Sequence, residues 1–187
     1  MNVYDFDGTL YAGDSSIEFV SFCRRRHPRL WLCAPRQLLA QLRYRRGRID
    51  RQSFKDELYC FCARVSDIRQ EVRLFWDRNE GKLAAWYRAQ HREDDVVISA
   101  SPDFLLREAC DRLGVRFLLA SEVDPRTGHS TAPNCRGAEK ARRFFAAFPD
   151  GVIDRFYTDL RTDRYLVPFA RESFLVTGDR REPWDGT

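Results

Sequence analysis

Two aspartates separated by one residue, Asp5 and Asp7, stand near the start of the chain and are followed by a Gly-Thr turn. Residues 2–5 are predicted to form a short buried strand, so both carboxylates would lie where that strand ends. A polar turn is the ordinary explanation of such a pair. A calcium-binding loop is excluded, because its required glycine would fall at position 10, which is leucine. A catalytic role for the pair depends on the other polar residues of the chain.

A second acidic pair, Asp159 and Asp163, follows a predicted strand at residues 152–157. Carboxylates from both pairs would repel one another at one sheet edge unless a cation lay among them. A hard cation with oxygen ligands, such as Mg²⁺, fits this requirement.

Two further residues could complete a site for phosphoryl transfer. Ser99 ends a predicted strand, and Lys140 lies near the start of a predicted helix. Phosphoryl transfer spreads negative charge over three oxygens, and its catalysis is mostly positioning and electrostatic stabilisation. A cation, an ammonium group and a hydroxyl around a carboxylate would supply both.

The elements that must position these residues are short apolar strands alternating with helices. This alternation predicts an α/β fold with a Rossmann-like parallel sheet flanked by helices. Ligands bind beyond the carboxyl ends of the strands in such sheets. A strong turn signal is present at 124–128. The predicted strands are 2–5, 96–98, 115–120, 152–157 and 173–177, and the predicted helices of this part are 104–113, 137–148 and 163–170.

Residues 15–90 show helical rather than strand patterning. We therefore predict a catalytic core of residues 1–13 and 93–187, interrupted after its first strand by an all-helical cap of residues 14–92. The expected cap helices begin at Ser15 or Ser16, cover 37–44 and 54–64, begin again at Ser66 or Asp67, and cover 82–91.

Taken in order, these motifs resemble the haloacid dehalogenase superfamily. The matching residues are Asp5-Phe6-Asp7-Gly8-Thr9, then Ser99, then Lys140, then Asp159 and Asp163. The helical insertion, the segment VVISASPDF at 96–104 and the segment NCRGAEK at 134–140 are similar to its phosphoserine-phosphatase-like branch. The resemblance covers nearly the whole chain.

The resemblance implies a Mg²⁺-dependent phosphatase in which Asp5 is the nucleophile and Asp7 is first general acid and then general base. The second aspartate separates the phosphatases from the dehalogenases of the superfamily. An aspartyl phosphate divides one difficult displacement into two easier ones. The remaining implied roles are metal ligation by Asp5, the carbonyl of Asp7 and Asp159, support of the metal shell by Asp163, phosphate or substrate binding by Ser99, Ala100 and Lys140, and orientation of the Asp7 loop by Thr9.

One residue departs from the family pattern. Leu160 follows Asp159 where a small or polar residue is common, and it could distort the metal loop. Two alternatives to hydrolysis stay open. The same intermediate permits transfer of the phosphoryl group to another acceptor, and a degenerate site would leave a membrane-peripheral binding protein.

The predicted cap carries an excess of positive charge. Residues 15–92 contain 18 Lys and Arg against 8 Asp and Glu, whereas the rest contains 14 against 20. A solvated surface, attraction of anionic substrates and contact with an anionic membrane are all compatible with this charge. No nucleic-acid-binding module is recognised. The substrate is expected to be a small phosphorylated metabolite or a lipid-like phosphate. Asp14 could bind a substrate amine or cap the first cap helix.

The composition is that of a globular protein, with 43% hydrophobic and 32% charged residues in 187. No run of 18 apolar residues and no signal peptide are recognised, so a cytoplasmic location is expected. The six cysteines have irregular spacing, which indicates reduced thiols, with a metal site as the alternative. The three histidines lie in no ligand spacing and are expected at the surface.

Overall fold

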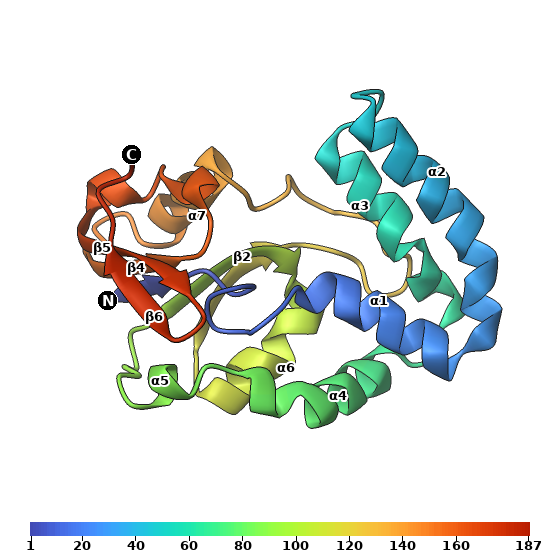
Figure 1. Cartoon of the computed structure of the whole chain (residues 1–187), viewed down its shortest axis with the longest axis horizontal. Helices are drawn as coiled ribbons and strands as arrows, with labels where there is room; N and C mark the ends of the chain where they lie inside the picture. The colour runs from blue at the N-terminus through green and yellow to red at the C-terminus, as the bar shows by residue number, and fades with distance from the viewer.

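The computed structural model describes all 187 residues as a six-stranded sheet with helices on both faces and a helical projection at one end (Figure 1). The strand order is β3-β2-β1-β4-β5-β6, with β1 to β5 parallel and β6 antiparallel. This confirms the predicted α/β fold. The strands are β1 (Asn2–Tyr4), β2 (Val96–Pro102), β3 (Phe117–Ser121), β4 (Ile153–Thr158), β5 (Ala170–Thr177) and β6 (Arg180–Pro183).

The segment between β1 and β2 contains only helices and short 3-10 turns. Asp14, Asp50 and Asp67 begin three of the helices by accepting a hydrogen bond from a backbone N–H of the first turn. The elements are α1 (Ser15–Arg26), η1 (Pro28–Cys33), α2 (Ala34–Arg45), α3 (Arg51–Tyr59), η2 (Cys60–Arg64), α4 (Ile68–Asn79), η3 (Glu80–Lys82) and α5 (Ala85–Arg88).

The core helices are α6 (Asp103–Leu113) and α7 (Ala138–Ala147), which lie on opposite faces of the sheet. Alternation along the strands divides the apolar side chains between these faces. Val3 joins a cluster with Phe144 of α7, whereas the neighbouring Tyr4 joins a larger cluster that includes Leu105 of α6. Gly114 ends α6 in the left-handed conformation, with φ of 75°.

The larger cluster continues from the core into the helical insertion. Trp76 of α4 is fully buried, and its indole N–H donates to the carbonyl of Leu105 at 2.8 Å. The helix α4 therefore covers one face of the sheet beside α6, whereas α2 and α3 project away from it (Figure 1). The division of the chain at residues 13/14 and 92/93 stays a prediction.

Three elements differ from the sequence-based predictions. The expected helix at 163–170 is wrong: the segment holds two 3-10 turns, η4 (Arg161–Asp163) and η5 (Val167–Phe169), because Pro168 interrupts it and β5 begins at Ala170. Strand β6 was not predicted, because its four exposed residues carry no apolar alternation. The helix expected at 82–91 is shorter in the structure, where it is limited to α5 (Ala85–Arg88). No helix is long and apolar enough to span a membrane.

Candidate active site

The sequence-predicted residues meet at the carboxyl edge of the parallel strands. Strand β1 lies between β2 and β4, and Asp5 follows β1 while Asp159 follows β4. The backbone N–H of Asp5 donates to the carbonyl of Tyr157 at 2.8 Å, which ties the two strand ends together. From β1 the sheet continues to β2 and β3 on one side and to β4 and β5 on the other. Open α/β sheets bind ligands at such a switch point.

The ammonium group of Lys140 lies between two buried carboxylates. Its Nζ is 2.9 Å from Oδ1 of Asp5 and 2.5 Å from Oδ2 of Asp163. Burial alone would lower the pKa of Lys140, but the two carboxylates outweigh it and raise the pKa, so the lysine stays charged. Burial raises the pKa of Asp5, and Lys140 opposes that shift. Burial prevails and holds the pKa of Asp5 at about 8, so the lysine limits this shift without cancelling it.

The carboxylate of Asp7 is held by the first turn of α1. The backbone N–H of Ser15 donates to Oδ1 at 2.7 Å, and the hydroxyl of Ser101 donates to Oδ2 at 2.5 Å. The Ser101 hydroxyl also lies 2.8 Å from that of Ser16. Burial raises the pKa of Asp7, while the bonds from Ser101 and Ser15 lower it. A carboxyl group with a raised pKa is suited to giving and taking a proton.

The carboxylate of Asp159 faces the turn after β1. A Cβ on Gly8 would lie 2.2 Å from Oδ2 of Asp159, and Gly8 has φ of 71°, so only glycine fits here. Oδ1 of Asp159 is buried without a hydrogen-bond partner, and burial raises the pKa of Asp159 to about 6. An orphaned carboxylate oxygen in the residue that shares a cavity with Asp5 fits a hard cation.

Metal ligands in this site would be few. No group of three or more His, Cys, Asp or Glu side chains is placed to hold a metal ion. The set that fits consists of two carboxylates, from Asp5 and Asp159, completed by the carbonyl of Asp7 and water. Mg²⁺ typically keeps several waters and takes only one or two protein carboxylates. The six cysteines are free and form no such group.

The other predicted site residues have unequal surroundings. Ser99 is buried, and its Oγ accepts from the backbone N–H of Ser101 at 3.1 Å. The carbonyl of Ala100 accepts from Ser121 Oγ at 2.7 Å and from Lys55. The hydroxyl of Thr9 is buried and has no hydrogen-bond partner, so no hydrogen bond of its side chain orients the Asp7 loop.

A cavity of about 520 Å³ opens over these residues, between the sheet edge and helices α1 and α3. Its lining from the core includes Asp5, Asp7, Ser99, Ala100 and Asp159. The cavity is also lined by residues that the sequence analysis did not select, namely the charged Arg51, Lys55 and Arg136 and the polar Ser101.

Lys55 links the projecting helices to the core. Its Nζ donates to the carbonyl of Ala100 and, at 2.7 Å, to Oδ1 of Asn134. Burial lowers the pKa of Lys55 to about 8. Ser101 could have been found from the sequence, because it lies in the 96–104 segment, two residues after Ser99. Lys55 could not, because nothing in the pattern of its helix distinguishes it from a surface lysine.

Asp14 and Leu160 both lie at the rim of the cavity. Oδ1 of Asp14 caps α1 by accepting from the N–H of Ile17 at 2.9 Å, which favours the capping role. Leu160 is 43% exposed, and its backbone N–H donates to Thr158 Oγ1 at 3.1 Å. The loop after Asp159 is thus closed by a backbone hydrogen bond with leucine at position 160.

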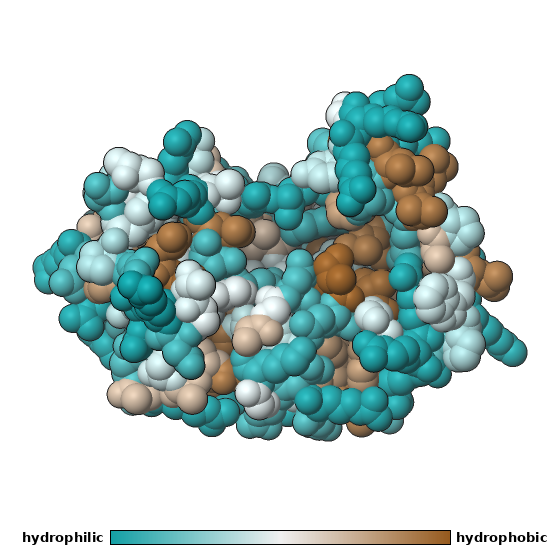
Figure 2. Space-filling view, in the orientation of Figure 1, coloured by the Kyte–Doolittle hydropathy of each residue, from teal (hydrophilic) through white to brown (hydrophobic).

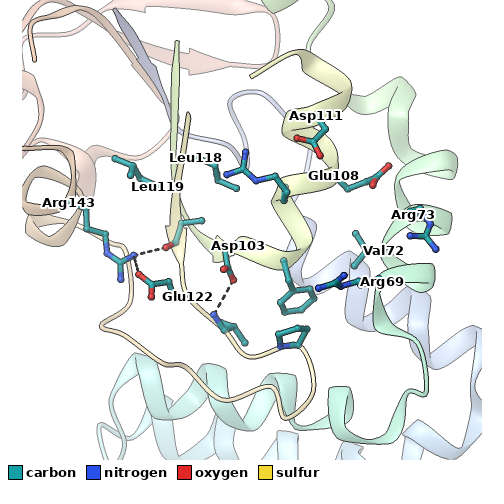
Figure 3. A pocket seen from close by; sticks show the side chains of 15 residues that line it. Arg69, Val72, Arg73, Asp103, Glu108, Asp111, Leu118, Leu119, Glu122 and Arg143 are labelled. Atoms are coloured by element: carbon teal, nitrogen blue, oxygen red, sulfur yellow. Dashed lines mark hydrogen bonds and ion pairs between the residues drawn. The ribbon is translucent and has the colours of Figure 1, made fainter. Parts of the chain in front are cut away.

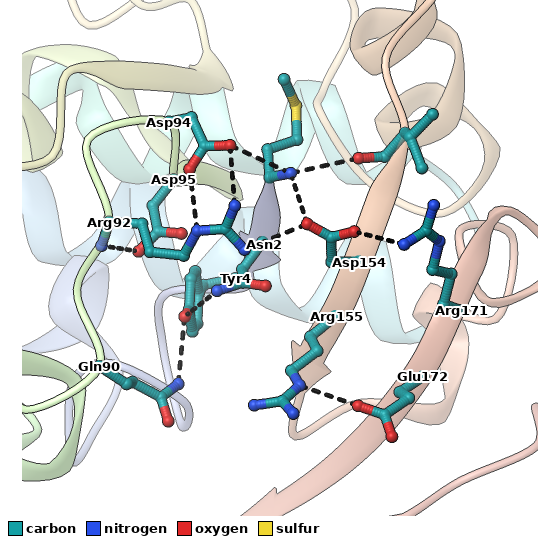
Figure 4. Close-up of polar contacts among 12 residues, drawn as sticks. Asn2, Tyr4, Gln90, Arg92, Asp94, Asp95, Asp154, Arg155, Arg171 and Glu172 are labelled. Atoms are coloured by element: carbon teal, nitrogen blue, oxygen red, sulfur yellow. Dashed lines mark hydrogen bonds and ion pairs between the residues drawn. The ribbon is translucent and has the colours of Figure 1, made fainter.

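Two further hollows are unlike the site. One lies between α4, α6 and β3 and has a mixed lining, in which Arg69, Arg73 and Arg143 alternate with acidic groups such as Glu108 (Figure 3). The other lies at the opposite, amino-terminal edge of the sheet. There the carboxylate of Asp154 pairs with neighbouring cationic groups (Figure 4). Neither hollow contains a nucleophile beside a base.

Comparison with solved structures identifies the fold. A protein of unknown function from Bordetella pertussis Tohama I aligns with a TM-score of 0.75 at 18% identity, covering 90% of this chain and 85% of that one. A phosphoserine phosphohydrolase-like protein from Francisella tularensis gives 0.55 at 19%, covering 92% and 86%. A phospho-aspartyl intermediate analogue of phosphoserine phosphatase gives 0.54 at 13%, covering 91% and 83%. Comparison with curated proteins gives no match by sequence.

The fold is thus shared with the phosphoserine-phosphatase-like α/β proteins among these structures. The family model for haloacid dehalogenase-like hydrolases matches residues 3–167, which include every motif described above. The chain belongs to the haloacid dehalogenase-like hydrolase family. This confirms the family and the fold branch expected from the sequence.

Proposed function

We propose that the protein is a Mg²⁺-dependent phosphatase that hydrolyses a phosphate monoester through an aspartyl phosphate on Asp5. The observation that carries the proposal is the buried contact of Asp5 with Lys140, next to Asp7 and open to one cavity. A nucleophile, a proton carrier and a fixed positive charge are the parts that this reaction requires.

In the first step, one carboxylate oxygen of Asp5 attacks phosphorus, and the bond from phosphorus to the leaving alcohol breaks. Oδ1 of Asp5 already accepts from Lys140 and from the N–H of Phe6 at 2.8 Å, so Oδ2 is the attacking atom. Asp7 gives its proton to the leaving oxygen, and the hydroxyl of Ser101 holds the carboxylate of Asp7 in place.

In the second step, Asp7 accepts a proton from a water molecule as that water attacks phosphorus. The bond from phosphorus to Asp5 breaks, and inorganic phosphate leaves with the carboxylate of Asp5 restored. Lys140 and the hydroxyl of Ser99 stabilise the negative charge of the phosphoryl oxygens. Each proton that Asp7 gives in the first step is regained in the second.

Asp5, the carbonyl of Asp7 and Asp159 would hold the magnesium ion, which supplies positive charge against the phosphoryl oxygens when it is bound. The orphaned oxygen of Asp159 supports this assignment. Because the lysine, both catalytic aspartates and Ser99 gather in one place, a degenerate site is disfavoured. Transfer to an acceptor other than water uses the same steps and is separated from hydrolysis by product analysis.

The test is phosphate release from p-nitrophenyl phosphate by the purified protein with and without Mg²⁺. Asp5→Asn is compared with Asp179→Asn, a matched change at an exposed carboxylate remote from the cavity. Turnover that requires Mg²⁺, survives in the control and disappears in Asp5→Asn supports the proposal. Turnover that persists in Asp5→Asn contradicts it. A new phosphate ester in place of free phosphate, formed when an alcohol is supplied, would indicate transfer.

A further inference from the structure

The helix α2 carries its leucines on the outside. Leu38, Leu39 and Leu42 are exposed, whereas the buried residues of α2 are Gln37 and Ala40. Gln37 is occupied by hydrogen bonds, since its amide donates to the carbonyl of Leu58 at 2.6 Å. A helix on the surface of a globular protein normally faces the core with its apolar side. The leucines of α2 are thus available to a ligand.

The exposed apolar residues are concentrated rather than scattered. Six of the ten large hydrophobic side chains that are exposed in the chain lie between residues 17 and 42. Figure 2 shows apolar side chains, beside polar ones, at the end of the molecule formed by α1, α2 and α3. A concentrated apolar patch of this kind marks a binding surface more often than single exposed residues do.

Part of this surface is a groove of about 650 Å³. Its walls include Trp31 of η1, Leu38 of α2 and Phe54 of α3, and no acidic residue lines it. The volume lies within the range of pockets that bind small organic molecules. The groove is therefore large enough and apolar enough for a hydrocarbon chain.

The groove adjoins the catalytic cavity. Ile17, Phe54 and Leu58 line both of them. One end of this combined space holds Asp5 and Asp7, while the other end is bounded by apolar side chains. A ligand that occupies both ends must have a phosphate at one end and an apolar group at the other.

The charge around the groove suits an anionic amphiphile. Residues 19–49 contain nine arginines and no acidic residue. Only Arg26 and Arg36 of these nine form ion pairs, with Glu71 and Glu57. The guanidinium group of Arg24 lies 5.3 Å from the ring centre of Trp31, at the groove itself. Unpaired arginines attract anionic ligands to this end of the molecule.

We propose that the substrate is an amphiphilic phosphate monoester, with its phosphate at Asp5 and its hydrocarbon chain in the groove formed by η1, α2 and α3. This assignment rests on the proposed function and adds the class of substrate. The continuity of groove and cavity selects the chain of the substrate itself as the occupant, rather than a partner protein.

The experiment compares butyl, octyl and dodecyl phosphate as substrates, each below its micelle concentration so that no lipid surface is present. Burial of each methylene contributes up to about fourfold to kcat/KM. We expect kcat/KM to rise about 10- to 100-fold from butyl to octyl phosphate, since part of the groove is open to solvent. Equal values of kcat/KM for the three esters would overturn the proposal.

Two neighbouring leucines provide matched variants. Leu38 lines the groove, whereas the adjacent Leu39 is exposed outside it. Leu38→Asp is expected to abolish most of the preference for the longer chains, and Leu39→Asp is expected to keep that preference. An equal loss of the chain-length preference in both variants would assign that preference to general attraction by the surface. It would overturn the assignment of the hydrocarbon chain to the groove.

Failure of the proposed function would be recognised separately, as absence of turnover with every ester and with p-nitrophenyl phosphate. Calorimetric binding of dodecylphosphonate and butylphosphonate would then test the groove alone. Tighter binding of the longer phosphonate, lost in Leu38→Asp and kept in Leu39→Asp, supports the groove. Equal affinities of the two phosphonates would refute it.

Discussion

Replacing Lys140 with methionine removes the only cation in direct contact with two buried carboxylates. Asp5 and Asp163 lie 2.9 and 2.5 Å from the ammonium group, and each of the three side chains is at most 6% exposed. Methionine keeps most of the volume but leaves both carboxylates unpaired. Breaking a buried ion pair by removing one partner costs about 3–5 kcal/mol. A change of 1 kcal/mol shifts Tm by about 2–4 °C in a chain of this size, so Lys140→Met is expected to lower Tm by about 6–20 °C.

The assay is thermal unfolding at pH 7 in the presence of a chelator, which removes any compensating divalent cation. Lys82→Met is the matched control, because Lys82 pairs with Glu18 at 2.7 Å on the surface, where an ion pair contributes about 0–1 kcal/mol. In a separate assay with Mg²⁺ and no chelator, phosphatase activity is expected to be lost in Lys140→Met and retained in the control. A Tm of Lys140→Met within about 2 °C of the wild type would refute the reasoning, because two buried unpaired carboxylates cannot be that inexpensive.

Ser101→Ala removes a hydrogen bond to the ionised Asp7 and is expected to lower kcat about 10- to 100-fold with KM little changed, as steady-state kinetics would reveal. Gly8→Ala drives a methyl group against Asp159 and is expected to raise the Mg²⁺ concentration for half-maximal activity in a metal titration; an unchanged midpoint would contradict the assigned contact. Burial lowers the pKa of Lys55 to about 8 in the folded chain. Between that pH and the higher pKa of Lys55 in the unfolded chain, the unfolded state binds more protons, so the free energy of unfolding rises with pH. Urea unfolding should show wild type gaining about 2 kcal/mol over Lys55→Met between pH 7.5 and 9.5; a constant difference would exclude the shift.

The central residues of the site could be predicted because their positions follow from strand ends. Asp5 and Asp159 each come after a short apolar run, and parallel strands place their carboxyl ends along one edge. Ser99 and Lys140 could be predicted from the order of the motifs along the sequence. Their mutual distances could not be predicted, since these depend on the strand order that places β1 between β2 and β4.

The contributions of the helical insertion were harder to predict. The apolar spacing at 37–44 indicated a helix correctly, yet it did not show that Leu38 and Leu42 face outward while Gln37 is buried. Periodicity gives the phase of an apolar stripe but not the direction in which the stripe points. The cavity role of Lys55 was missed for a similar reason, because its partners, the carbonyl of Ala100 and Asn134, are far from it in sequence.

The contacts of the insertion also determine which part of it can open the cavity. Helix α4 shares the main core through Trp76, and the start of α1 holds Asp7 through the N–H of Ser15. Displacing either helix would expose buried aromatic surface or release the carboxylate of Asp7. Helices α2 and α3 project from the sheet, and Lys55 of α3 reaches the core through its bonds to Ala100 and Asn134. A substrate that enters by displacing α2 and α3 would break those bonds while Asp7 stays in place, so entry through the groove side preserves the catalytic geometry.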